Sequence, residues 1–261
     1  MAGQAEPIDM ADWFQSAPGR YVQAWEQAQI DAMVADVFGY YAWQVGLGQL
    51  DLLRANRIPF KGYVAERAPE GALRERWQGS VIANAAELPF ESQSVDLLVL
   101  PHVLESSDAP HQVLREVERV LMPEGRVVLT GFNPWSLWGL RGAMPGFDPW
   151  LPSAPSQQVS VARLKDWFKL LSLEIDRGRF GCYVPPCQSK KWLDRWQFME
   201  KAGDRWWAVG GAVYVVSAVK RVAGMRLVGP GWKKKKRRRA RAAAAVAVPR
   251  MADAKQVKES V

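Results

Sequence analysis

The chain has only two histidines and two cysteines, the residue types that most often act as bases, nucleophiles or metal ligands near neutral pH. His102 directly follows a predicted strand, where a neutral imidazole could accept a proton from an oxygen or nitrogen nucleophile. The alternative interpretation is a structural histidine whose ring is satisfied by its neighbours. His111 lies in the first turn of a predicted surface helix, so we expect it to be solvated. Cys182 and Cys187 have C-x4-C spacing without a second ligand pair, which predicts free thiols and no metal site.

Seven apolar segments read as strands and set the expected fold class. The segment Val95–Leu100 is apolar apart from Asp96, which is typical of a strand covered on both faces. Helical patterns are interleaved with the strands, which predicts an α/β fold: a Rossmann-like, doubly wound, mostly parallel seven-stranded sheet with helices on both faces. The predicted strands are Tyr40–Val45, Lys61–Ala65, Ser80–Ala83, Val95–Leu100, Arg126–Thr130, Leu173–Val184 and Ala212–Ala218.

Three helices are marked by their apolar spacing and their end signals. The segment Gly19–Gly39 has apolar residues at helical spacing and a glycine as its stop. A second helix carries Val113, Leu114, Val117, Val120 and Leu121 on one face; Asp108 can cap its start, Pro110 lies in its first turn, and Pro123 with Gly125 follows its end. A third helix is predicted after Ser160. The sequence therefore predicts an N-terminal helical segment (1–39) before the main domain (40–222).

The segment Phe132–Gln158 is too long and too aromatic for a simple connection, since it holds five prolines among its tryptophans. We expect it to be a lid-like insertion or surface loop that could close over a ligand.

The charge of the chain is concentrated in its last residues. Residues 231–261 contain eleven Lys and Arg and two acids, so their net charge is +9. Since the whole chain has a net charge of +8, residues 1–230 have a net charge of −1. Such a segment predicts a disordered basic tail. It could make weak contact with a polyanion, either nucleic acid or an anionic membrane, or only aid solubility.

The sequence contains no evident targeting or membrane-spanning segment. The first ten residues lack a basic region followed by an apolar stretch. The longest low-charge apolar run, Ala208–Val219, is shorter than the roughly 20 residues of a membrane span. We therefore expect a soluble, cytoplasmic protein with 48% hydrophobic residues and ample apolar area for a core.

Four tryptophans gather between residues 190 and 207, with basic neighbours. Trp192 and Trp196 share one helical stripe, and such a stripe is more often core than a ligand platform. We favour packing for Trp192, Trp196, Trp206 and Trp207, and the basic neighbours leave a membrane-surface or nucleic-acid face open.

Four motifs in order resemble the class I S-adenosylmethionine-dependent methyltransferases, in particular the small-molecule group called methyltransferase type 11. They are Asn84-Ala85-x-x-Leu88-Pro89-Phe90, Ser94-Val95-Asp96, His102-Val103-Leu104-Glu105 and Leu121-Met122-Pro123-Glu124-Gly125. The resemblance in detail covers about a fifth of the chain. It implies S-adenosylmethionine as cofactor and methyl transfer as activity.

The resemblance also implies where the cofactor lies. Asn84, Ala85 and Leu88 would form an apolar slot with one polar group for adenine, and Glu66 would bind the ribose hydroxyls. The family's glycine turn after the first strand corresponds to Gln44-Val45-Gly46-Leu47-Gly48-Gln49-Leu50, so Gln44, Gly46 and Gly48 are candidate cofactor contacts. Gln replaces the family's acid there and Leu50 its third glycine. The segment also does not match the G-x-G-x-x-G motif of dinucleotide-binding proteins, because position 51, where that motif has its third glycine, is Asp.

By the same resemblance, His102 would lie beside the transferred methyl group and is the candidate base. Asn133 and Trp135 follow the fifth strand, where substrate contacts are expected in this family.

Three functions remain open from the sequence. The first is methyl transfer from S-adenosylmethionine to an unidentified, small-molecule acceptor. The second is a degenerate methyltransferase fold that acts as a non-catalytic interaction module, which the altered glycine turn would fit. The third is an RNA or protein methyltransferase recruited through the basic tail.

Overall fold

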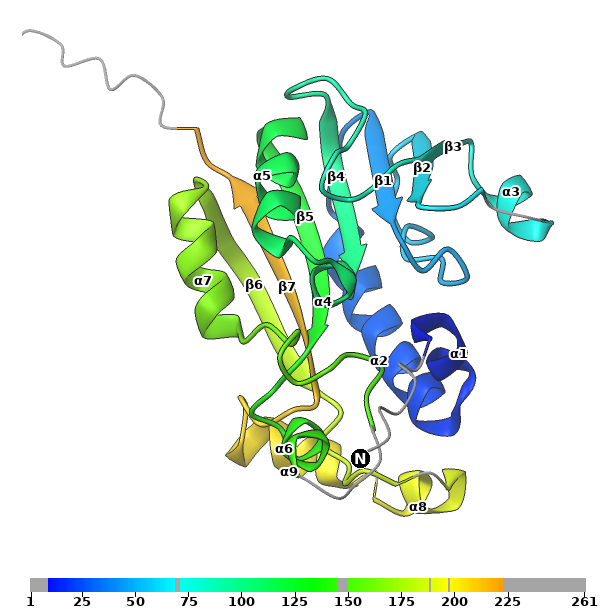
Figure 1. Ribbon diagram of the computed structural model, residues 1–261, viewed down its shortest axis with the longest axis vertical. Helices are drawn as coiled ribbons and strands as arrows, with labels where there is room; N and C mark the ends of the chain where they lie inside the picture. The colour runs from blue at the N-terminus through cyan, green and yellow to red at the C-terminus, as the bar shows by residue number, and fades with distance from the viewer. Residues whose placement is uncertain (1–8, 69–70, 145–149, 188, 197, 223–261) are drawn as a thin grey trace, which may run out of the picture. The chain divides into compact units, whose positions relative to one another are not determined.

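The structure is a computed structural model that describes residues 9–68, 71–144, 150–187, 189–196 and 198–222. Its seven strands form one sheet in the order β3-β2-β1-β4-β5-β7-β6 (Figure 1). Strands β1 to β5 are parallel to one another, whereas β7 is antiparallel to both β5 and β6. The predicted fold class is therefore confirmed. The strands are β1 (Tyr41–Val45), β2 (Phe60–Ala65), β3 (Gly79–Ile82), β4 (Val95–Pro101), β5 (Leu121–Phe132), β6 (Leu173–Gly181) and β7 (Val213–Lys220).

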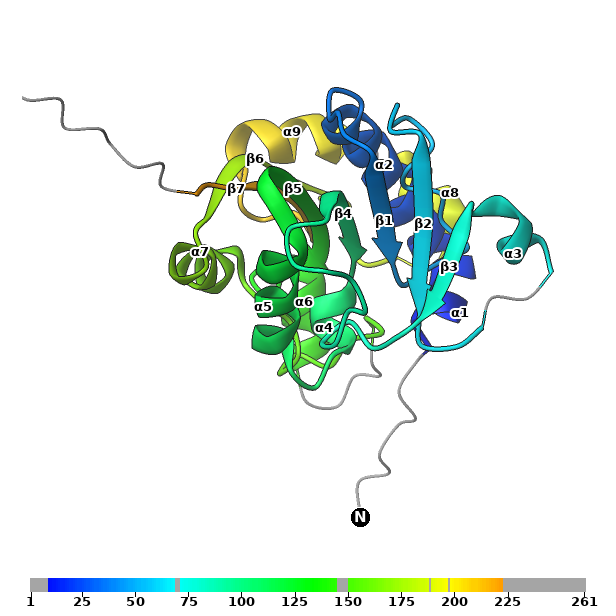
Figure 2. The same cartoon turned by 90° about the horizontal axis from the view of Figure 1, so that it is seen from above.

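Helices cover the two faces of the sheet, as Figure 2 shows from above. Helix α2 (Ala17–Val34) lies on one face, and α5 (Pro110–Val120) and α7 (Val161–Leu170) lie on the other. The residues of β4 divide accordingly: Leu98 and Leu100 are buried in the core that includes α5, and Leu97 and Val99 in the core that includes α2. This alternation explains why the strand reads as an almost unbroken apolar run.

The polar residue within that run has a structural partner. Asp96 accepts hydrogen bonds from the backbone N–H groups of Tyr40 and Tyr41, at 2.7 and 2.9 Å. The carboxylate therefore anchors the entry to β1, and it does not interrupt the buried part of β4.

Several predicted boundaries change in the structure. The N-terminal helix is two helices, α1 (Met10–Gln15) and α2, because Ser16 has an extended backbone between them. Helix α2 stops at Val34, before Gly39. The expectation that Asp108 caps α5 is wrong: the helix begins at Pro110, its N-cap is Ala109, and no side chain caps it. Strand β6 ends at Gly181 because Cys182 adopts a positive φ of 62°.

No helix follows the glycine turn. Residues 46–59, between β1 and β2, form a connection of turns. Its Leu50, Leu52 and Leu53 are buried in the core beside α2. The remaining short helices are α3 (Ala72–Arg76), α4 (Val103–Ser106), α6 (Leu137–Ala143), α8 (Lys190–Arg195) and α9 (Phe198–Trp206).

The described part of the 132–158 segment contains a helix, and its Phe132, Trp138 and Trp150 are buried, whereas Trp135 is exposed. Ser136 caps α6 by accepting a hydrogen bond from Gly139 N at 3.0 Å. Trp138 is buried and donates its indole N–H to the carbonyl of Val184 at 2.6 Å. Trp13 of α1 donates to the carbonyl of Trp150 at 3.0 Å. These tryptophans serve as core for the N-terminal helix, and the predicted lid motion stays a prediction.

The tryptophans between residues 190 and 207 are mostly exposed. The expected packing is wrong for Trp192, Trp206 and Trp207, which all have more than half of their surface open to solvent. Trp196 directly follows α8 and donates its backbone N–H to the carbonyl of Trp192 at 3.1 Å, so the two tryptophans lie one helical turn apart, as predicted.

Three further expectations can be compared with the described residues. Cys182 and Cys187 are free thiols, as predicted. Among the described residues, no helix is long and apolar enough to cross a membrane. The basic tail, residues 231–261, lies outside the described residues.

Candidate functional site

A polar pocket lies where the carboxyl ends of β2 and β3 approach α4. It has a volume of about 300 Å³ and contains three of the predicted cofactor residues: Glu66, Asn84 and Ala85. The other lining residues come from the turn after β3 and from the start of α4 to the start of α5: Ala86, Glu87, Val103, Ser106, Ser107, Asp108 and Ala109. Ligands of open α/β sheets bind at this edge, so the position of the pocket fits the predicted cofactor site.

Gly46 lies next to Val103, one of the residues that line this pocket. Its φ of +74° is a left-handed conformation that suits glycine, and a Cβ added there would meet only the Val103 side chain, at 3.5 Å. The space around the Gly46 Cα is therefore open apart from this contact, and the predicted approach of a cofactor to its backbone stays a prediction.

Gly48 is a glycine for a different reason. A Cβ at this position would lie 2.6 Å from the ring of Tyr63 and 2.7 Å from its hydroxyl oxygen. Its backbone N–H donates to the Tyr63 hydroxyl at 3.1 Å, so this donor is already used inside the protein. The close contact with Tyr63 of β2 therefore explains why glycine is needed at position 48, and the predicted cofactor contact of Gly48 stays a prediction.

Gln44 also serves the connection and not the pocket. Its amide nitrogen donates to the carbonyls of Gly46, Leu47 and Leu50 at 3.2, 3.0 and 2.9 Å, and its Oε1 accepts from Leu52 N at 3.1 Å. The side chain is fully buried. Gln44 is therefore a positioning residue: it holds residues 46–52 in a turn that no helix stabilises.

Asn84 and Leu88, which were predicted to contact adenine together, lie in different surroundings. Asn84 is exposed at the pocket, and its Oδ1 accepts from Ala86 N at 2.8 Å, which shapes the turn. Leu88, by contrast, is buried in the core, and its backbone N–H donates to Glu116 of α5 at 3.1 Å. Leu88 does not line the pocket, because the turn after Asn84 directs it into the core, so its predicted cofactor contact is not supported.

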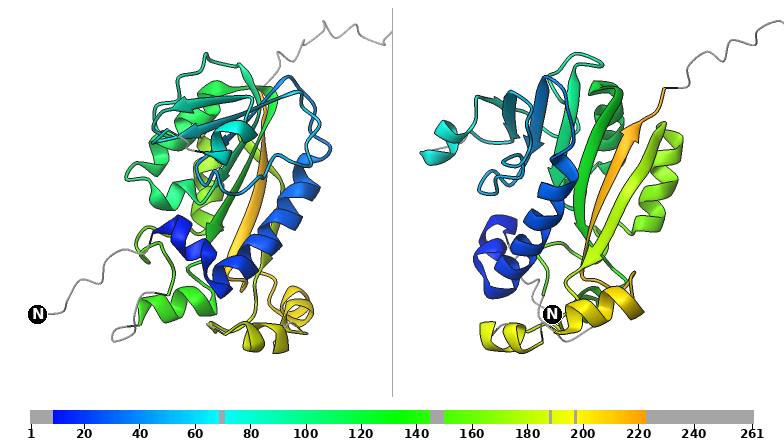
Figure 3. Two further views of the ribbon diagram at one scale, coloured as in Figure 1. Left: turned by 90° about the vertical axis from the view of Figure 1, so that its right-hand side faces the viewer. Right: turned by 180° about the vertical axis from the view of Figure 1, so that it is seen from behind.

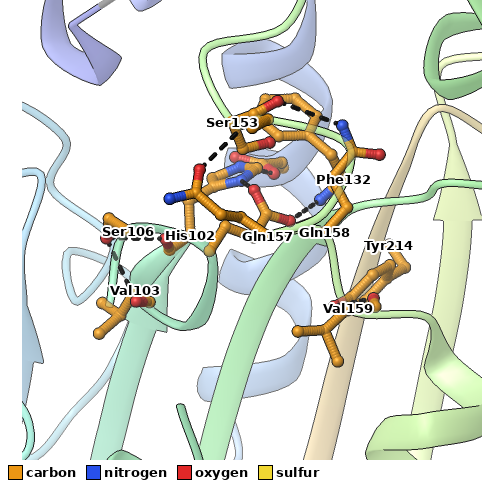
Figure 4. Close-up of polar contacts among 12 residues, drawn as sticks. His102, Val103, Ser106, Phe132, Ser153, Gln157, Gln158, Val159 and Tyr214 are labelled. Carbon is orange, nitrogen blue, oxygen red and sulfur yellow. Dashed lines mark hydrogen bonds and ion pairs between the residues drawn. The ribbon is translucent and has the colours of Figure 1, made fainter. Parts of the chain in front are cut away.

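His102 is buried between two carboxylates. Its Nε2 lies 2.8 Å from Glu26 Oε1 of α2, and its Nδ1 lies 3.2 Å from Glu105 Oε2 of α4. Glu105 also accepts a hydrogen bond from Phe132 N at the end of β5. Figure 4 shows His102 beside Phe132 at the carboxyl ends of β4 and β5. The rings of Phe14 and Phe132 lie against the imidazole, with centroids 5.5 and 4.3 Å away.

The two carboxylates decide the charge of this imidazole. Burial alone lowers the pKa of His102, but the negative charges and hydrogen bonds of Glu26 and Glu105 outweigh it and raise the pKa to about 10. Burial raises the pKa of Glu105 in turn. An imidazole that keeps its proton at neutral pH cannot accept another. Since only 1% of the side chain is exposed, the geometry favours the structural alternative for His102 over the candidate base.

Sequence reasoning missed Glu26, although a signal was available. Glu26 lies four residues before Ile30 and four after Val22, on the apolar stripe of α2, and it is fully buried. An acid on a buried stripe needs a cationic or hydrogen-bonding partner. The sequence does not show that the partner is His102, because 76 residues separate the two.

The two predicted substrate residues have different surroundings. Asn133 is buried, and its amide nitrogen donates to the carbonyls of Val209 and Gly211 at 2.8 and 2.9 Å. Its Oδ1 accepts from Trp135 N at 3.1 Å. Asn133 therefore joins the end of β5 to the approach of β7, and both of its amide N–H donors are used inside the protein. Trp135 is exposed and lines an apolar groove on the same edge of the sheet.

Comparison with known proteins agrees with the fold. A family profile described as "Methyltransferase domain" matches residues 61–129, which contain Glu66, Asn84, Ala85 and Val103. A SAM-dependent methyltransferase from Thermotoga maritima superposes with a TM-score of 0.55 at 14% identity, over 80% of this chain and 93% of that one. The chain has the class I methyltransferase fold. The resemblance expected from the sequence motifs is confirmed.

The class I methyltransferase fold is shared with proteins of other activities. The [4+2]-cyclase SpnF superposes with a TM-score of 0.54 at 16% identity, over 78% of this chain and 82% of that one. Fold similarity at these identities does not assign an activity.

Two curated proteins match part of the chain. The uncharacterized protein YafS of Escherichia coli strain K12 is 40% identical over 95 residues, which is 36% of this chain and 39% of that protein. The mitochondrial 2-methoxy-6-polyprenyl-1,4-benzoquinol methylase of Caenorhabditis elegans is 37% identical over 60 residues, which is 23% of this chain and 20% of that protein. The matches thus span well under half the length of either relative.

Proposed function

We propose that this chain binds S-adenosylmethionine in the pocket beside α4 and transfers its methyl group to a small-molecule acceptor. The observation that carries the proposal is the convergence of Glu66, Asn84, Ala85 and Val103 around one pocket at the carboxyl edge of the sheet, next to the open side of Gly46. These residues come from four separate parts of the chain, and the matched methyltransferase profile contains all of them except Gly46.

Each pocket residue has a role that suits the adenosine half of the cofactor. The exposed carboxylate of Glu66 can accept hydrogen bonds from the two ribose hydroxyls. Ala85 and Val103 provide apolar contacts for the adenine ring, and the Asn84 amide provides a polar group at its edge. The residues that the structure describes therefore fit this half of the group.

The reaction would ask little of the protein beyond placement. When bound, S-adenosylmethionine supplies a methyl group on a positively charged sulfur that leaves readily. The chain's part is to hold cofactor and acceptor in line and to exclude water, so no universal catalytic side chain is required. This agrees with a buried, protonated His102 that cannot serve as base. The partial match to a benzoquinol methylase supports methyl transfer as the reaction class.

Calorimetric titration with S-adenosylmethionine and S-adenosylhomocysteine tests the proposal directly. Glu66→Gln should weaken binding by about 1.5–3 kcal/mol, because it removes a charged partner of the ribose hydroxyls. Gly46→Val should abolish binding, because a β-branched residue does not tolerate the φ of +74° and its side chain would occupy the space beside Val103 that the cofactor needs. Glu91→Gln is the matched control, since Glu91 is exposed and does not line the pocket. Equal affinities for the Glu66 and Glu91 variants would refute the assignment of the pocket.

A second candidate function is a non-catalytic interaction module with the same fold. Two observations favour it: no helix follows the glycine turn in residues 46–59, and Tyr63 already fills the space at Gly48. The turn therefore lacks the helix N-terminus that usually presents free N–H groups to a ligand. If wild-type protein binds neither S-adenosylmethionine nor S-adenosylhomocysteine in the same titration, this second function replaces the first.

A further inference from the structure

One end of the molecule carries an unusual number of exposed aromatic and aliphatic side chains. Helices α6, α8 and α9 gather at this end, beyond the carboxyl end of β5 (Figures 1 and 3). Trp135 is 81% exposed, Trp206 74% and Trp207 65%. We call this surface the aromatic face; it consists of Trp135, Leu137, Leu140, Trp206, Trp207 and Val209.

The aromatic face is hollowed by an apolar groove. The groove has a volume of about 350 Å³ and lies between α6 and α9. Leu137 and Leu140 line it from one helix and Met199 and Trp207 from the other, with Trp135 at the turn before α6. Side chains from segments about 60 residues apart therefore form one continuous apolar surface. Contiguous exposed apolar surface of this kind marks an interaction site.

Basic residues accompany the face. Residues 190–207 contain five Lys and Arg and three acids. Lys191 and Arg205 are exposed, and neither lies within ion-pair distance of a carboxylate among the described side chains. Of the acids, Glu200 is turned inward, where it bonds the Tyr21 hydroxyl and accepts from Tyr183 N at 2.9 Å. Of the charged side chains described there, Lys191, Arg195 and Arg205 are exposed and one acid, Asp204, is exposed too, so the charge presented beside the tryptophans is net positive.

We propose that the aromatic face docks onto an anionic phospholipid bilayer, with Trp135, Trp206 and Trp207 entering the headgroup region and Lys191 and Arg205 meeting lipid phosphates. Tryptophan is enriched at the membrane–water interface because its ring is apolar and its N–H is polar. Trp and Leu on one surface with Lys and Arg beside them are typical of segments that lie in the interface without spanning it. The groove gives an acyl chain an apolar recess between α6 and α9.

The charge pattern favours a bilayer over a second copy of the chain. In a symmetric dimer the same face would meet itself, so two patches of net positive charge, each with Lys191, Arg195 and Arg205 against Asp204, would be brought together. An anionic bilayer instead offers a phosphate for each cation. The proposal is independent of methyl transfer, since it needs neither cofactor nor acceptor.

Vesicle co-sedimentation of the full chain tests the proposal. The vesicles are phosphatidylcholine, with or without phosphatidylglycerol. Wild-type protein should bind the anionic vesicles more tightly. Trp206→Ser with Trp207→Ser should lower the partition coefficient at least tenfold on anionic vesicles. The matched control is Phe38→Ser with Tyr40→Ser, because both residues are more than 70% exposed but lie before β1, at the opposite edge of the sheet. The control should bind like wild type.

A second pair of substitutions separates charge from insertion. Lys191→Gln and Arg205→Gln should each lower binding to anionic vesicles roughly fivefold and leave binding to pure phosphatidylcholine unchanged. The residues of the basic tail are present in every variant, so differences between variants report the face alone. Thermal melting of each variant checks that the fold is intact.

Three results would overturn the proposal. The first is wild-type protein that does not sediment with anionic vesicles. The second is a tryptophan double variant that binds vesicles like wild type, which would assign any binding to other parts of the chain. The third is a double variant that loses self-association or binding to single-stranded RNA while keeping vesicle binding, which would make the face a protein or RNA interface.

Discussion

Replacing His102 by Gln should destabilise the fold and make its stability depend less steeply on pH in the alkaline range. The imidazolium lies between Glu26 and Glu105, with all three side chains at most 1% exposed. Removing the cation leaves two buried carboxylates facing a neutral amide. Breaking a buried ion pair from one side typically costs about 3–5 kcal/mol, and we expect a loss in that range at pH 7.

The pH dependence follows from the raised pKa. In the unfolded chain the imidazole titrates near its ordinary pKa of 6.5, and in the folded protein near 10. The folded state therefore holds the proton more tightly, so its contribution to stability is complete below pH 6.5 and is lost as pH rises through 10. Over the whole range from pH 6.5 to 10, the bound proton contributes at most about 5 kcal/mol to the stability of the fold. Between these two pH values the contribution falls by about 1.4 kcal/mol for each pH unit.

Urea unfolding between about pH 7.5 and about pH 9 measures this slope. Wild-type protein should lose roughly 2 kcal/mol across that window beyond what His102→Gln loses. The thiol of Cys182, whose pKa burial raises, adds a loss of the same sign, but it does so equally in both proteins. His111→Gln is the control, because His111 is exposed and should leave the slope unchanged.

A double variant separates the ion pair from simple packing. Adding Glu26→Gln to His102→Gln removes one of the stranded carboxylates, so part of the lost stability should return. Two results would refute the idea that the imidazolium holds α2 to the end of β4. One is a His102→Gln variant whose stability depends on pH as steeply as that of the wild type. The other is a double variant in which Glu26→Gln lowers the stability by as much as it does alone in the wild-type protein.

Two further predictions concern the connection between β1 and β2. Gln44→Ala should destabilise the protein by roughly 2–4 kcal/mol in urea unfolding, because three carbonyls and one N–H lose their buried partner; unchanged stability would contradict the positioning role. Gly48→Ala should cost about 1–3 kcal/mol, because the new Cβ would lie 2.6 Å from the Tyr63 ring. A smaller side chain at position 63, Tyr63→Leu, should recover part of that loss in the double variant.

The fold was readable from the sequence because its main features are local patterns. Each strand is a short apolar run, and the burial of β4 on both faces follows from the uninterrupted run in Val95–Leu100. The order of the strands then follows from the resemblance and from right-handed crossovers. Boundaries were less certain, because they depend on single residues such as Cys182, whose positive φ ends β6.

The sequence predicted only part of the site, and there is a physical reason why some residues line the pocket and others do not. The sequence predicted that Glu66 and Asn84 lie at one site because they follow strand ends, and parallel strands place the side chains after their carboxyl ends at one edge of the sheet. Both residues line the pocket at that edge. Gln44, Gly48 and Asn133 occupy equivalent positions, yet their partners are backbone groups or a tyrosine far along the chain. A sequence pattern shows that a polar residue or glycine sits at the edge, but it does not show whether a ligand or the protein itself uses it.

The absence of a helix in residues 46–59 ties these observations together. In a fold whose first connection is helical, the glycine turn is held by the helix that follows it. Here the turn is held from both sides by side chains: Gln44 bonds its carbonyls from β1, and Tyr63 bonds Gly48 from β2. A Cβ at Gly46 would meet only Val103, whereas a Cβ at Gly48 would meet the ring of Tyr63. If S-adenosylmethionine binds in the pocket as proposed, its adenosine half would meet Glu66, Asn84 and Ala85, whereas its amino acid half would meet fewer backbone donors than a helix N-terminus offers.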